Sequence, residues 1–343
     1  MIINIILTII LFMILVIPHE FGHLVAAKKM GVKVNEFSAG MGPALWQKQK
    51  GETLYSVRAV PLGGYCAMEG EDATDDEANV PDNPRAFNNA AWWRKLVILF
   101  AGAFTNILVA IVTMIITVTI IGMPVNTLSK VSPDGPAAQA GLRQGDKIVS
   151  VQGEDVHSWS DTMSVLNRED GKRPVKVEVL RSGKTREYSV TPVASEKEPG
   201  RYVIGIEAAV SHNIFRGIYY GTVTTWKVNA AMYQALGQLF SRGVSAGDVA
   251  GPVGLVSIVD KTRAAGLINL LYLVSIISLN LAIINLLPIP ALDGGRILFV
   301  IIRKISGDRI TDKMESYVHL AGMMLLLILF VFITWHDITG LIK

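Results

Sequence analysis

The chain has 343 residues, half of them hydrophobic and only 18% charged. A net charge of +3 gives no reason to expect nucleic acid as a partner, and a mean hydropathy of +0.40 excludes an ordinary soluble domain. The single cysteine, Cys66, excludes an intramolecular disulfide and leaves the redox compartment undecided. These values favour a membrane protein.

Four long apolar segments are candidates for membrane-spanning helices. A hydrocarbon core of about 30 Å takes about 20 apolar residues in a helix, and the segments 2–27, 96–123, 264–292 and 317–335 are long enough. We therefore expect a polytopic α-helical membrane protein with four transmembrane helices. The predicted division of the chain is 1–30, 31–91, 92–123, 124–210, 211–263, 264–302, 303–316 and 317–343, with the spans in the first, third, sixth and last segments.

The sequence His19-Glu20-Phe21-Gly22-His23 ends the first apolar run, which contains no charged residue before it. On a helix, residues i and i+4 lie on one face, so both imidazoles can bind one metal ion. Glu20 is rotated off the line that joins them, where it can reach a water molecule without being a ligand. Two imidazoles and one carboxylate suit zinc and leave a fourth position open. A chance match in a solvated helix is the alternative, and ionisable residues at membrane depth argue against it.

Basic residues beside the spans predict the orientation of the chain. They gather after the first span, before the second, and between the third and fourth: Lys28, Lys29, Lys33, Arg94, Lys95, Arg303, Lys304, Arg309 and Lys313. The positive-inside rule places the connection between spans one and two, and the connection between spans three and four, in the cytoplasm. Both termini and the long segment between spans two and three are then outside, and the histidine pair lies near the cytoplasmic side.

Between the first two spans, residues 32–37, 44–49 and 53–60 are predicted strands, and P-L-G-G-Y at 61–65 closes the last of them. A small cytoplasmic hairpin is one interpretation. The other is a sheet that re-enters the membrane beside the metal, where its open edge would pair with an extended peptide. The acidic stretch 69–77 is a predicted solvated loop.

The second span contains the run A-G-A-F-T-N at 101–106. Small residues let helices approach closely, and a buried amide such as Asn106 needs partners. Helix packing alone explains the run, and this interpretation is favoured over a direct catalytic role for Asn106.

Residues 128–193 have the composition of a soluble domain. The pattern A-G-L-x-x-G-D at 140–146 leads into a predicted strand at 147–151, and further strands at 175–180 and 187–190 flank a turn. This α+β pattern resembles a PDZ domain, whose groove binds peptide by adding a strand at a sheet edge. A spacer that excludes bulky substrates is an equal alternative. The following segment, 213–242, has the spacing of a helix lying along the outer membrane surface, and burial against protein explains the same spacing.

The third span ends in N-L-A-I-I-N-L-L-P-I-P-A-L-D-G-G-R at 280–296. Two prolines break the helix and a Gly-Gly pair permits a close turn, so Asp293 can be aimed away from the helix axis. Asp293 is the first charged residue after Arg263 and falls at the cytoplasmic end of its span, so we expect it to be the third metal ligand. A helix cap or an ion pair with Arg296 is the alternative. His319, near the same end of span four, is the only substitute ligand.

Taken together, H-E-F-G-H in the first span and N-L-L-P-I-P-A-L-D-G-G in the third resemble the site-two protease family of zinc intramembrane metalloproteases. The PDZ-like segment and R-A-V-P-L-G-G-Y at 58–65 are similar to its bacterial regulator-of-sigma-E protease branch. The resemblance covers nearly the whole chain. One PDZ-like segment is found here, whereas some members of the branch carry two in tandem.

The resemblance implies roles for residues, substrates and location. The implied roles are zinc ligation for His19, His23 and Asp293, catalytic acid/base for Glu20, contact with substrate or ordering of span three for Asn280 and Asn285, and a membrane-re-entrant β-loop containing Gly63, Gly64 and Tyr65. Members of the family cleave single-span membrane proteins such as anti-sigma factors, typically after a first cut outside the membrane, and some clear remnant signal peptides. The resemblance also implies the lipid bilayer of the bacterial cytoplasmic (inner) membrane, with the PDZ-like domain extracytoplasmic.

Three other functions fit parts of the sequence. A membrane-anchored PDZ adaptor with a degenerate metal site would bind peptide without zinc, yet every proposed metal residue is present. A transporter would also have broken helices with polar residues, but no inverted repeat is visible. A conventional metalloprotease tethered by its first helix would cleave soluble proteins, and the position of the motif inside an apolar run argues against it.

Overall fold

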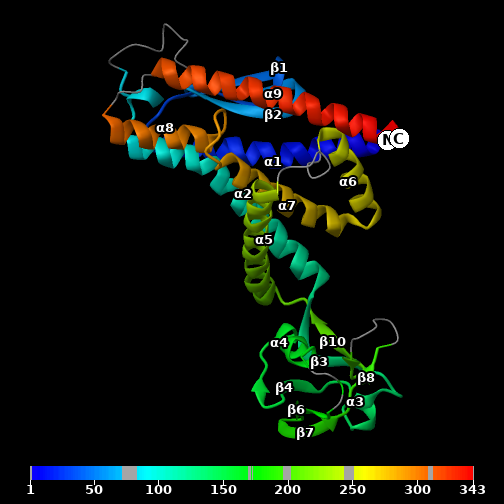
Figure 1. Ribbon diagram of the computed structural model, residues 1–343. Coiled ribbons are helices and arrows are strands. Elements are labelled where there is room, and N and C mark those ends of the chain that lie inside the picture. The colour runs from blue at the N-terminus through cyan, green and yellow to red at the C-terminus, as the bar shows by residue number, and fades with distance from the viewer. Residues whose placement is uncertain are drawn as a thin grey trace. The chain divides into compact units, whose positions relative to one another are not determined.

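The computed structural model describes residues 2–71, 83–168, 171, 173–195, 202–242, 251–307 and 312–342. The chain forms two compact units (Figure 1), which we describe separately. The helical unit consists of Met1–Thr117 and Gly221–Lys343, and the inserted unit is Val118–Tyr220. Most of the predicted acidic loop, from residue 72 to residue 77, lies outside the described residues.

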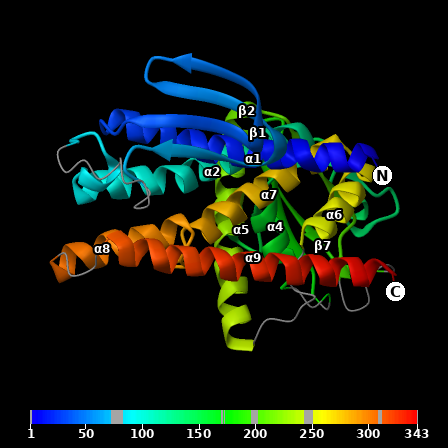
Figure 2. The same ribbon diagram turned by 90° about the horizontal axis from the view of Figure 1, so that it is seen from above.

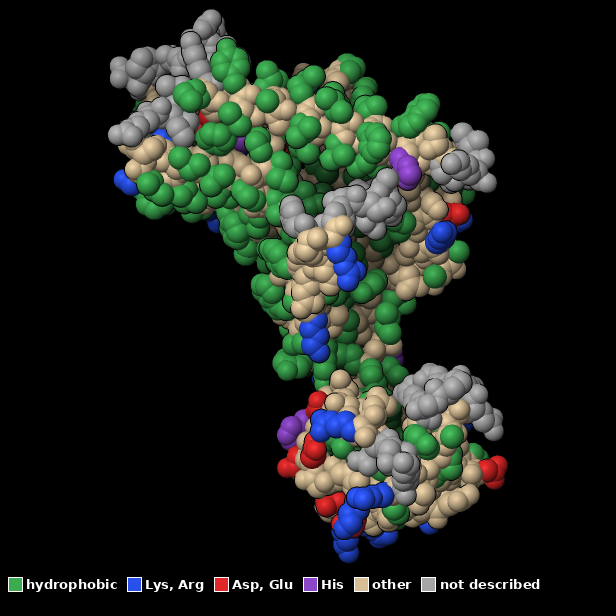
Figure 3. Space-filling model, viewed as in Figure 1, with side chains coloured by type: hydrophobic (Ala, Val, Ile, Leu, Met, Phe, Trp, Pro, Cys, Tyr) green, Lys and Arg blue, Asp and Glu red, His purple; other side chains and the backbone are tan. Residues whose placement is uncertain are grey.

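The helices of the helical unit follow the apolar segments. They are α1 Ile2–Lys29, α2 Trp92–Ile121, α5 Ile214–Arg242, α6 Pro252–Ala264, α7 Leu267–Asn285, α8 Asp293–Ser306 and α9 Asp312–Ile342, with α2 and α5 continuing into the inserted unit. Four of them, α1, α2, α7 and α9, are long and apolar enough to cross a membrane. Hydrophobic side chains dominate the visible face of this unit (Figure 3), as expected for a surface that contacts lipid.

The predicted third span, 264–302, is two helices. α7 ends at Asn285, and α8 begins at Asp293 after a connection that contains both prolines. The break therefore falls where Pro288 and Pro290 predict it. The predicted connection 303–316 is shorter than expected, because α8 continues to Ser306 and α9 begins at Asp312.

Close packing of α1 against its neighbours holds the helical unit together. Leu24 of α1 lies in one buried cluster with Ile98 and Leu99 of α2. Towards the other end of α1, Leu15 packs with residues of α6 and α7, including Val259. Lipid tails are as apolar as these side chains, so van der Waals contact and not escape from water stabilises such an interface.

A long antiparallel hairpin, β1 Val34–Lys50 and β2 Thr53–Met68, lies beside α1 (Figure 2). The start of β1, from Val34 to Ala39, pairs on one side with 54–57 and on the other with 64–68. The prediction that P-L-G-G-Y ends the last strand is wrong, since β2 runs through these residues to Met68. Pairing with the start of β1, from Val34 to Ala39, at the far end of the hairpin keeps this glycine-rich stretch extended.

The inserted unit is an α+β fold around one main sheet. Its elements are β3 Met123–Val131, α3 Pro136–Gln139, β4 Lys147–Val151, β5 Glu154–Asp155, α4 Trp159–Leu166, β6 Val175–Arg181, β7 Lys184–Val190, β8 Val193–Ala194, β9 Tyr202–Val203 and β10 Ile206–Ser211. The order of the main sheet is β10-β3-β4-β6-β7, and β8 and β9 pair separately from it. Alternate residues of β6, such as Val175, Val177 and Val179, are fully buried in its core. The strands predicted at 147–151, 175–180 and 187–190 are confirmed.

The A-G-L-x-x-G-D pattern ends in a buried anchor of the inserted unit. Asp146 is 1% exposed, accepts two hydrogen bonds of 2.6 Å from Arg181, and accepts another from the Arg143 amide. Burial alone would raise the pKa of the Asp146 carboxyl, but these hydrogen bonds and the Arg181 charge outweigh it and lower that pKa. The Asp146–Arg181 pair therefore stabilises the folded unit at pH values above the ordinary pKa of aspartate. This contribution is lost as the pH falls from that value through the lowered pKa of the folded state.

The segment predicted as one amphipathic stretch, 211–263, contains two helices. α5 is the helix predicted in this segment, and its place along the membrane surface stays a prediction, whereas α6 was not predicted. α6 begins at Pro252, where the fixed φ of proline suits a first helical turn. The carboxylate of Asp337 on α9 accepts a 2.8 Å hydrogen bond from the Gly254 amide in that turn, a contact that local sequence does not reveal.

Candidate metal centre

His19 and His23 lie on one face of α1, four residues apart, as the motif predicts. Both side chains are buried, with residue exposures of 8% and 6%. Their Nε2 atoms face each other at 3.3 Å. Two ring nitrogens at this distance, inside an apolar helix bundle, require a shared proton or a shared cation.

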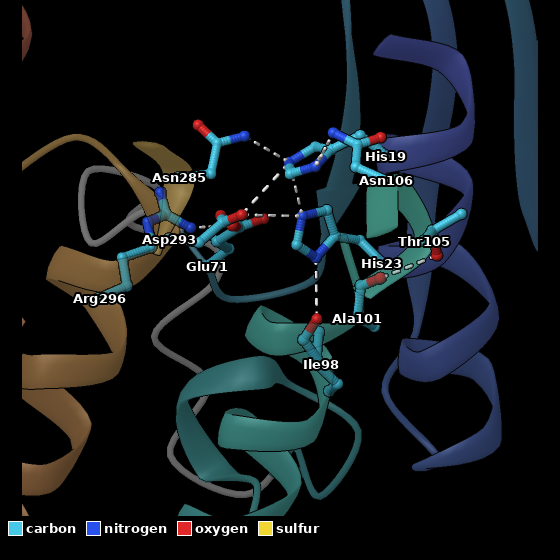
Figure 4. A network of polar contacts seen from close by, with 10 residues as sticks. All are labelled: His19, His23, Glu71, Ile98, Ala101, Thr105, Asn106, Asn285, Asp293 and Arg296. Atoms are coloured by element: carbon cyan, nitrogen blue, oxygen red, sulfur yellow. Dashed lines mark hydrogen bonds and ion pairs between the residues drawn. The ribbon is translucent and has the colours of Figure 1, made fainter. Parts of the chain in front are cut away.

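The third group of the cluster is Asp293, the first residue of α8. Its Oδ2 atom lies 3.2 Å from Nε2 of His19 and 3.4 Å from Nε2 of His23 (Figure 4). The Gly-Gly pair makes this approach possible, because a Cβ on Gly294 or Gly295 would overlap the backbone of the preceding loop. The prediction that the prolines and glycines bring Asp293 to the histidines fits this geometry.

The geometry of these three donor atoms fits a tetrahedral metal ion. Ligand atoms held about 2.0–2.1 Å from zinc lie about 3.3–3.4 Å from one another, and the three observed separations are 3.2, 3.3 and 3.4 Å. Asp293 Oδ2 is buried and accepts no hydrogen bond from any described residue. Two imidazoles and a carboxylate are donors that zinc prefers, so the residues present fit this ion.

Helix α2 orients both imidazoles. His23 Nδ1 donates a 2.8 Å hydrogen bond to the carbonyl of Ile98, which leaves the Nε2 lone pair for a metal. His19 Nδ1 lies 3.4 Å from the side-chain amide of Asn106, whose Oδ1 has no partner among the described residues. Exchanging the positions of the amide oxygen and nitrogen leaves the shape of the Asn106 side chain unchanged. With the oxygen facing His19, Asn106 Oδ1 accepts a hydrogen bond from Nδ1–H of His19. Both rings then present the same tautomer to the cluster.

Two glycines give the imidazoles room against α2. A Cβ on Gly102 would overlap Nε2 of His23 and Cε1 of His19, and a Cβ on Gly22 would overlap the carbonyl of Ala101. Gly102, within the run of small residues at 101–103, therefore does more than bring helices together. Its missing side chain leaves the space that the metal-facing rings occupy.

Glu20 lies between the cluster and strand β2. A Cβ on Gly64 would lie 3.5 Å from Cγ of Glu20, an ordinary contact distance, so this part of β2 is a neighbour of Glu20. Among the described residues, the stretch from Gly64 to Met68 pairs only with β1, so its other edge is unpaired. A cavity of about 410 Å³ joins Glu20, the cluster and the Tyr65–Met68 stretch. This brings Gly64 and Tyr65 to the site, through a strand that was predicted to end before them. Gly63 instead faces Met41 of β1, and its role in contacting substrate stays a prediction.

A second cavity, of about 270 Å³, opens on the other side of the same cluster. Leu15, Leu281 and Asn285 line it together with His19, Glu20 and Asp293. The Asn285 amide lies 3.4 Å from Nε2 of His19, so this predicted residue reaches the site. Asn280 does not: its side chain is exposed on α7, and it lines neither cavity. Its role in contacting substrate stays a prediction.

Within the described part of the chain, Asp293 neither caps α8, whose N-cap is Leu292, nor forms the alternative ion pair with Arg296, and His319 is not a substitute ligand. Arg296 forms an ion pair with Glu71, which follows β2. His319 is not a member of the cluster and instead accepts a 2.8 Å hydrogen bond from the backbone amide of Ala291. The Glu71 and Ala291 contacts join residues far apart in sequence, and no local signal would have found them.

The site combines two imidazoles, the Asp293 carboxylate, a second carboxylate on Glu20 and an open strand edge. These are the parts of a metal-dependent peptidase. Residues 7–329 match peptidase family M50. The chain therefore belongs to peptidase family M50 and is a zinc metalloprotease, and its four apolar helices fit a multi-pass membrane protein.

Relatives match over almost the full length of the chain. A relative from Clostridium acetobutylicum that is named as a zinc metalloprotease is 36% identical over 339 residues, which cover 98% of this chain and 97% of the relative. The regulator of sigma-W protease RasP of Bacillus subtilis is 30% identical over 414 aligned positions, with 97% of each chain covered. Because 414 exceeds the 343 residues present here, RasP contains residues opposite a gap in this chain. Over 26% of the chain, the PDZ domain of an SdrC-like protein from Listeria monocytogenes is 25% identical, with a TM-score of 0.22.

Proposed function

We propose that this zinc metalloprotease is an intramembrane endopeptidase that cleaves the membrane-spanning segments of single-span proteins. The observation that carries the proposal is the convergence of His19, His23 and Asp293 beside Glu20, among apolar helices. In this proposal the first three residues hold zinc and Glu20 is the catalytic acid and base.

The proposed chemistry divides between the ion and the protein. Zinc held by His19, His23 and Asp293 would lower the pKa of a bound water molecule and would polarise the scissile carbonyl. Glu20 takes the proton of the attacking water and delivers it to the leaving amine. The Ile98 carbonyl and Asn106 hold the imidazoles in one orientation, so the ligand atoms need not rearrange during the reaction.

The unpaired edge of β2 supports a role in presenting substrate. A helical substrate hides its carbonyls in hydrogen bonds, so it must unwind locally before it can be attacked. The edge from Gly64 to Met68 offers an unwound segment new backbone partners next to Glu20. Arg58 stiffens this sheet, since its guanidinium donates to Glu36 at 2.7 Å and lies 5.4 Å from the Tyr65 ring centroid. We assign Gly63, Gly64 and Tyr65 to this presenting strand and Asn285 to the opposite cavity.

The proposed location is the bacterial cytoplasmic membrane, with both termini and the inserted unit outside. Basic residues at the ends of the spans support this orientation. One relative is named a regulator of sigma-W protease, so anti-sigma factors that have already been cut outside the membrane are our first candidate substrates. Remnant signal peptides are the second.

The purified full-length chain should cleave a single-span substrate in proteoliposomes and leave soluble casein intact. A chelator should stop cleavage, and added zinc should restore it, because the nucleophile depends on the ion. Substrate fragments and bound metal would be measured on the same samples. Cleavage of casein would indicate a tethered conventional protease instead, and zinc-independent peptide binding without any cleavage would indicate an adaptor.

The inserted unit, which we propose is PDZ-like, is proposed to control access. A cavity of about 720 Å³ lies between α4, through Met163 and Leu166, and the stretch from Tyr202 to Glu207. This cavity gives a recruited peptide end a place to bind. A size filter needs no such binding, so the two mechanisms differ in their effect on KM.

Excision of the inserted unit distinguishes these mechanisms. Deleting only 128–193 would remove the part of β3 that pairs with Ile206 to Ala208 and leave half of β10 unpaired, so a better excision joins Gly122 to His212 through a short glycine linker. Met123 and Ser211 are paired residues, which places the two ends side by side. The excised protein should keep its zinc and cleave a short trimmed substrate with an almost unchanged kcat.

The substrates for this comparison are a long and a trimmed version of one single-span protein. A size filter predicts faster cleavage of the long version after excision. Recruitment predicts a higher KM for the trimmed version with little change in kcat. A folded, zinc-loaded excision variant that is inactive on both versions would contradict the access proposal.

A further inference from the structure

The connection that delivers Asp293 to the cluster has an unfavourable backbone conformation. Ala291 has a φ of 76°, in the left-handed region that residues with a Cβ rarely adopt. Leu292 then returns to an extended conformation, and Asp293 begins α8. Such a conformation persists only where surrounding contacts hold it in place.

His319 supplies one of these contacts from α9. The Ala291 amide donates a 2.8 Å hydrogen bond to Nδ1 of His319. Nδ1 is therefore an acceptor, and the proton of the neutral ring is on Nε2. The side chain is 13% exposed, and its ring centroid lies 5.4 Å from that of Phe299 on α8. Glu315, at 3.9 Å from Nε2, is too distant for a hydrogen bond.

Gly322 gives a second contact, one helical turn further along α9. A Cβ at this position would lie 2.5 Å from Cβ of Pro290 and 2.7 Å from its carbonyl oxygen. α9 thus packs directly on the residue before Ala291, at a point where only glycine fits. His319 and Gly322 lie on the same face of the helix, three residues apart.

We propose that His319 is a positioning residue for the metal site. By holding the Ala291 amide, it fixes the turn from which Asp293 reaches the two histidines, and it does not itself contact the ion. Gly322 allows α9 to come close enough for this hydrogen bond. The inference rests on the proposed assignment of Asp293 as a zinc ligand.

Zinc affinity of the full-length protein in detergent, measured by competition with a chelator of known affinity, tests this role. His319→Leu removes the acceptor and should weaken zinc binding about 10- to 100-fold, as is typical when an outer partner of a ligand is lost. His319→Asn places an amide oxygen near the position of Nδ1 and should stay within a few-fold of the wild type. His336→Leu is the matched control, an exposed histidine on the same helix, and should leave affinity unchanged.

The outcomes separate this inference from the metal assignment. Wild-type affinity in His319→Leu, or equal weakening in the Leu and Asn variants, would overturn the positioning role. If His319→Leu does not fold, Gly322→Ala replaces it, since the added Cβ must displace Pro290. Wild-type affinity in that variant would also overturn the proposal. An Asp293→Ala variant that binds zinc normally would instead refute the assignment of the ligand.

Discussion

Glu20→Gln is expected to retain zinc and the native fold while losing cleavage. The amide has nearly the shape of the carboxylate, but it can neither take the proton of the attacking water nor return it to the leaving amine. General acid–base groups typically contribute about 10²- to 10⁴-fold to a rate, so kcat should fall by at least this factor. The measurement is kcat on a single-span substrate, with zinc content determined on the same preparation.

A second carboxylate in the same cavity provides the matched control for Glu20. Glu71 also lines the cavity of about 410 Å³, where it pairs with Arg296. Glu71→Gln should therefore change kcat much less than Glu20→Gln. A Glu20→Gln enzyme that cleaves at the normal rate would show that another group is the base.

Asp293→Ala is expected to lose both zinc and cleavage. The substitution removes one of three donor atoms and leaves two facing imidazoles without a negative charge between them. Since loss of an outer partner already costs about 10- to 100-fold in affinity, loss of the ligand should cost more. Zinc content after dialysis and kcat of the zinc-saturated protein are the measurements.

Asp293→Asn separates charge from shape in this experiment. The amide oxygen keeps the position of a donor but lacks the charge, so its zinc affinity should lie between those of the wild type and Asp293→Ala. Full metal content and full activity in Asp293→Ala would remove this residue from the ligand set. His319 would not be an obvious replacement, because its Nδ1 accepts a hydrogen bond from Ala291.

The parts of the site that follow a local rule could be predicted from the sequence. Helical spacing places His19 and His23 on one face, and apolar run lengths locate the long helices. The two prolines between α7 and α8 locate the helix break that turns Asp293 out of the span. Each of these inferences needs only residues within a few positions of one another.

The parts that depend on distant partners could not be predicted in this way. Glycine and proline at 61–64 indicate the end of a strand, and only pairing with β1 keeps that stretch extended. Asn106 was interpreted as a packing residue because nothing near it in sequence shows that His19 is its neighbour. Pro252 signals a possible helix start, but the carboxylate that caps α6 comes from α9. Tertiary contacts decide all three cases.

The ligand set joins α1 to α8, with the hairpin, α2 and the whole inserted unit in the loop between them. An ion bound in this way also acts as a cross-link, because the unfolded chain has no preformed site and must close a very long loop to make one. Ligand binding to the folded state alone stabilises it by about 4 kcal/mol when free zinc is 1,000 times the Kd. Zinc supply would then shift the equilibrium between the folded and unfolded protein as well as the rate of catalysis.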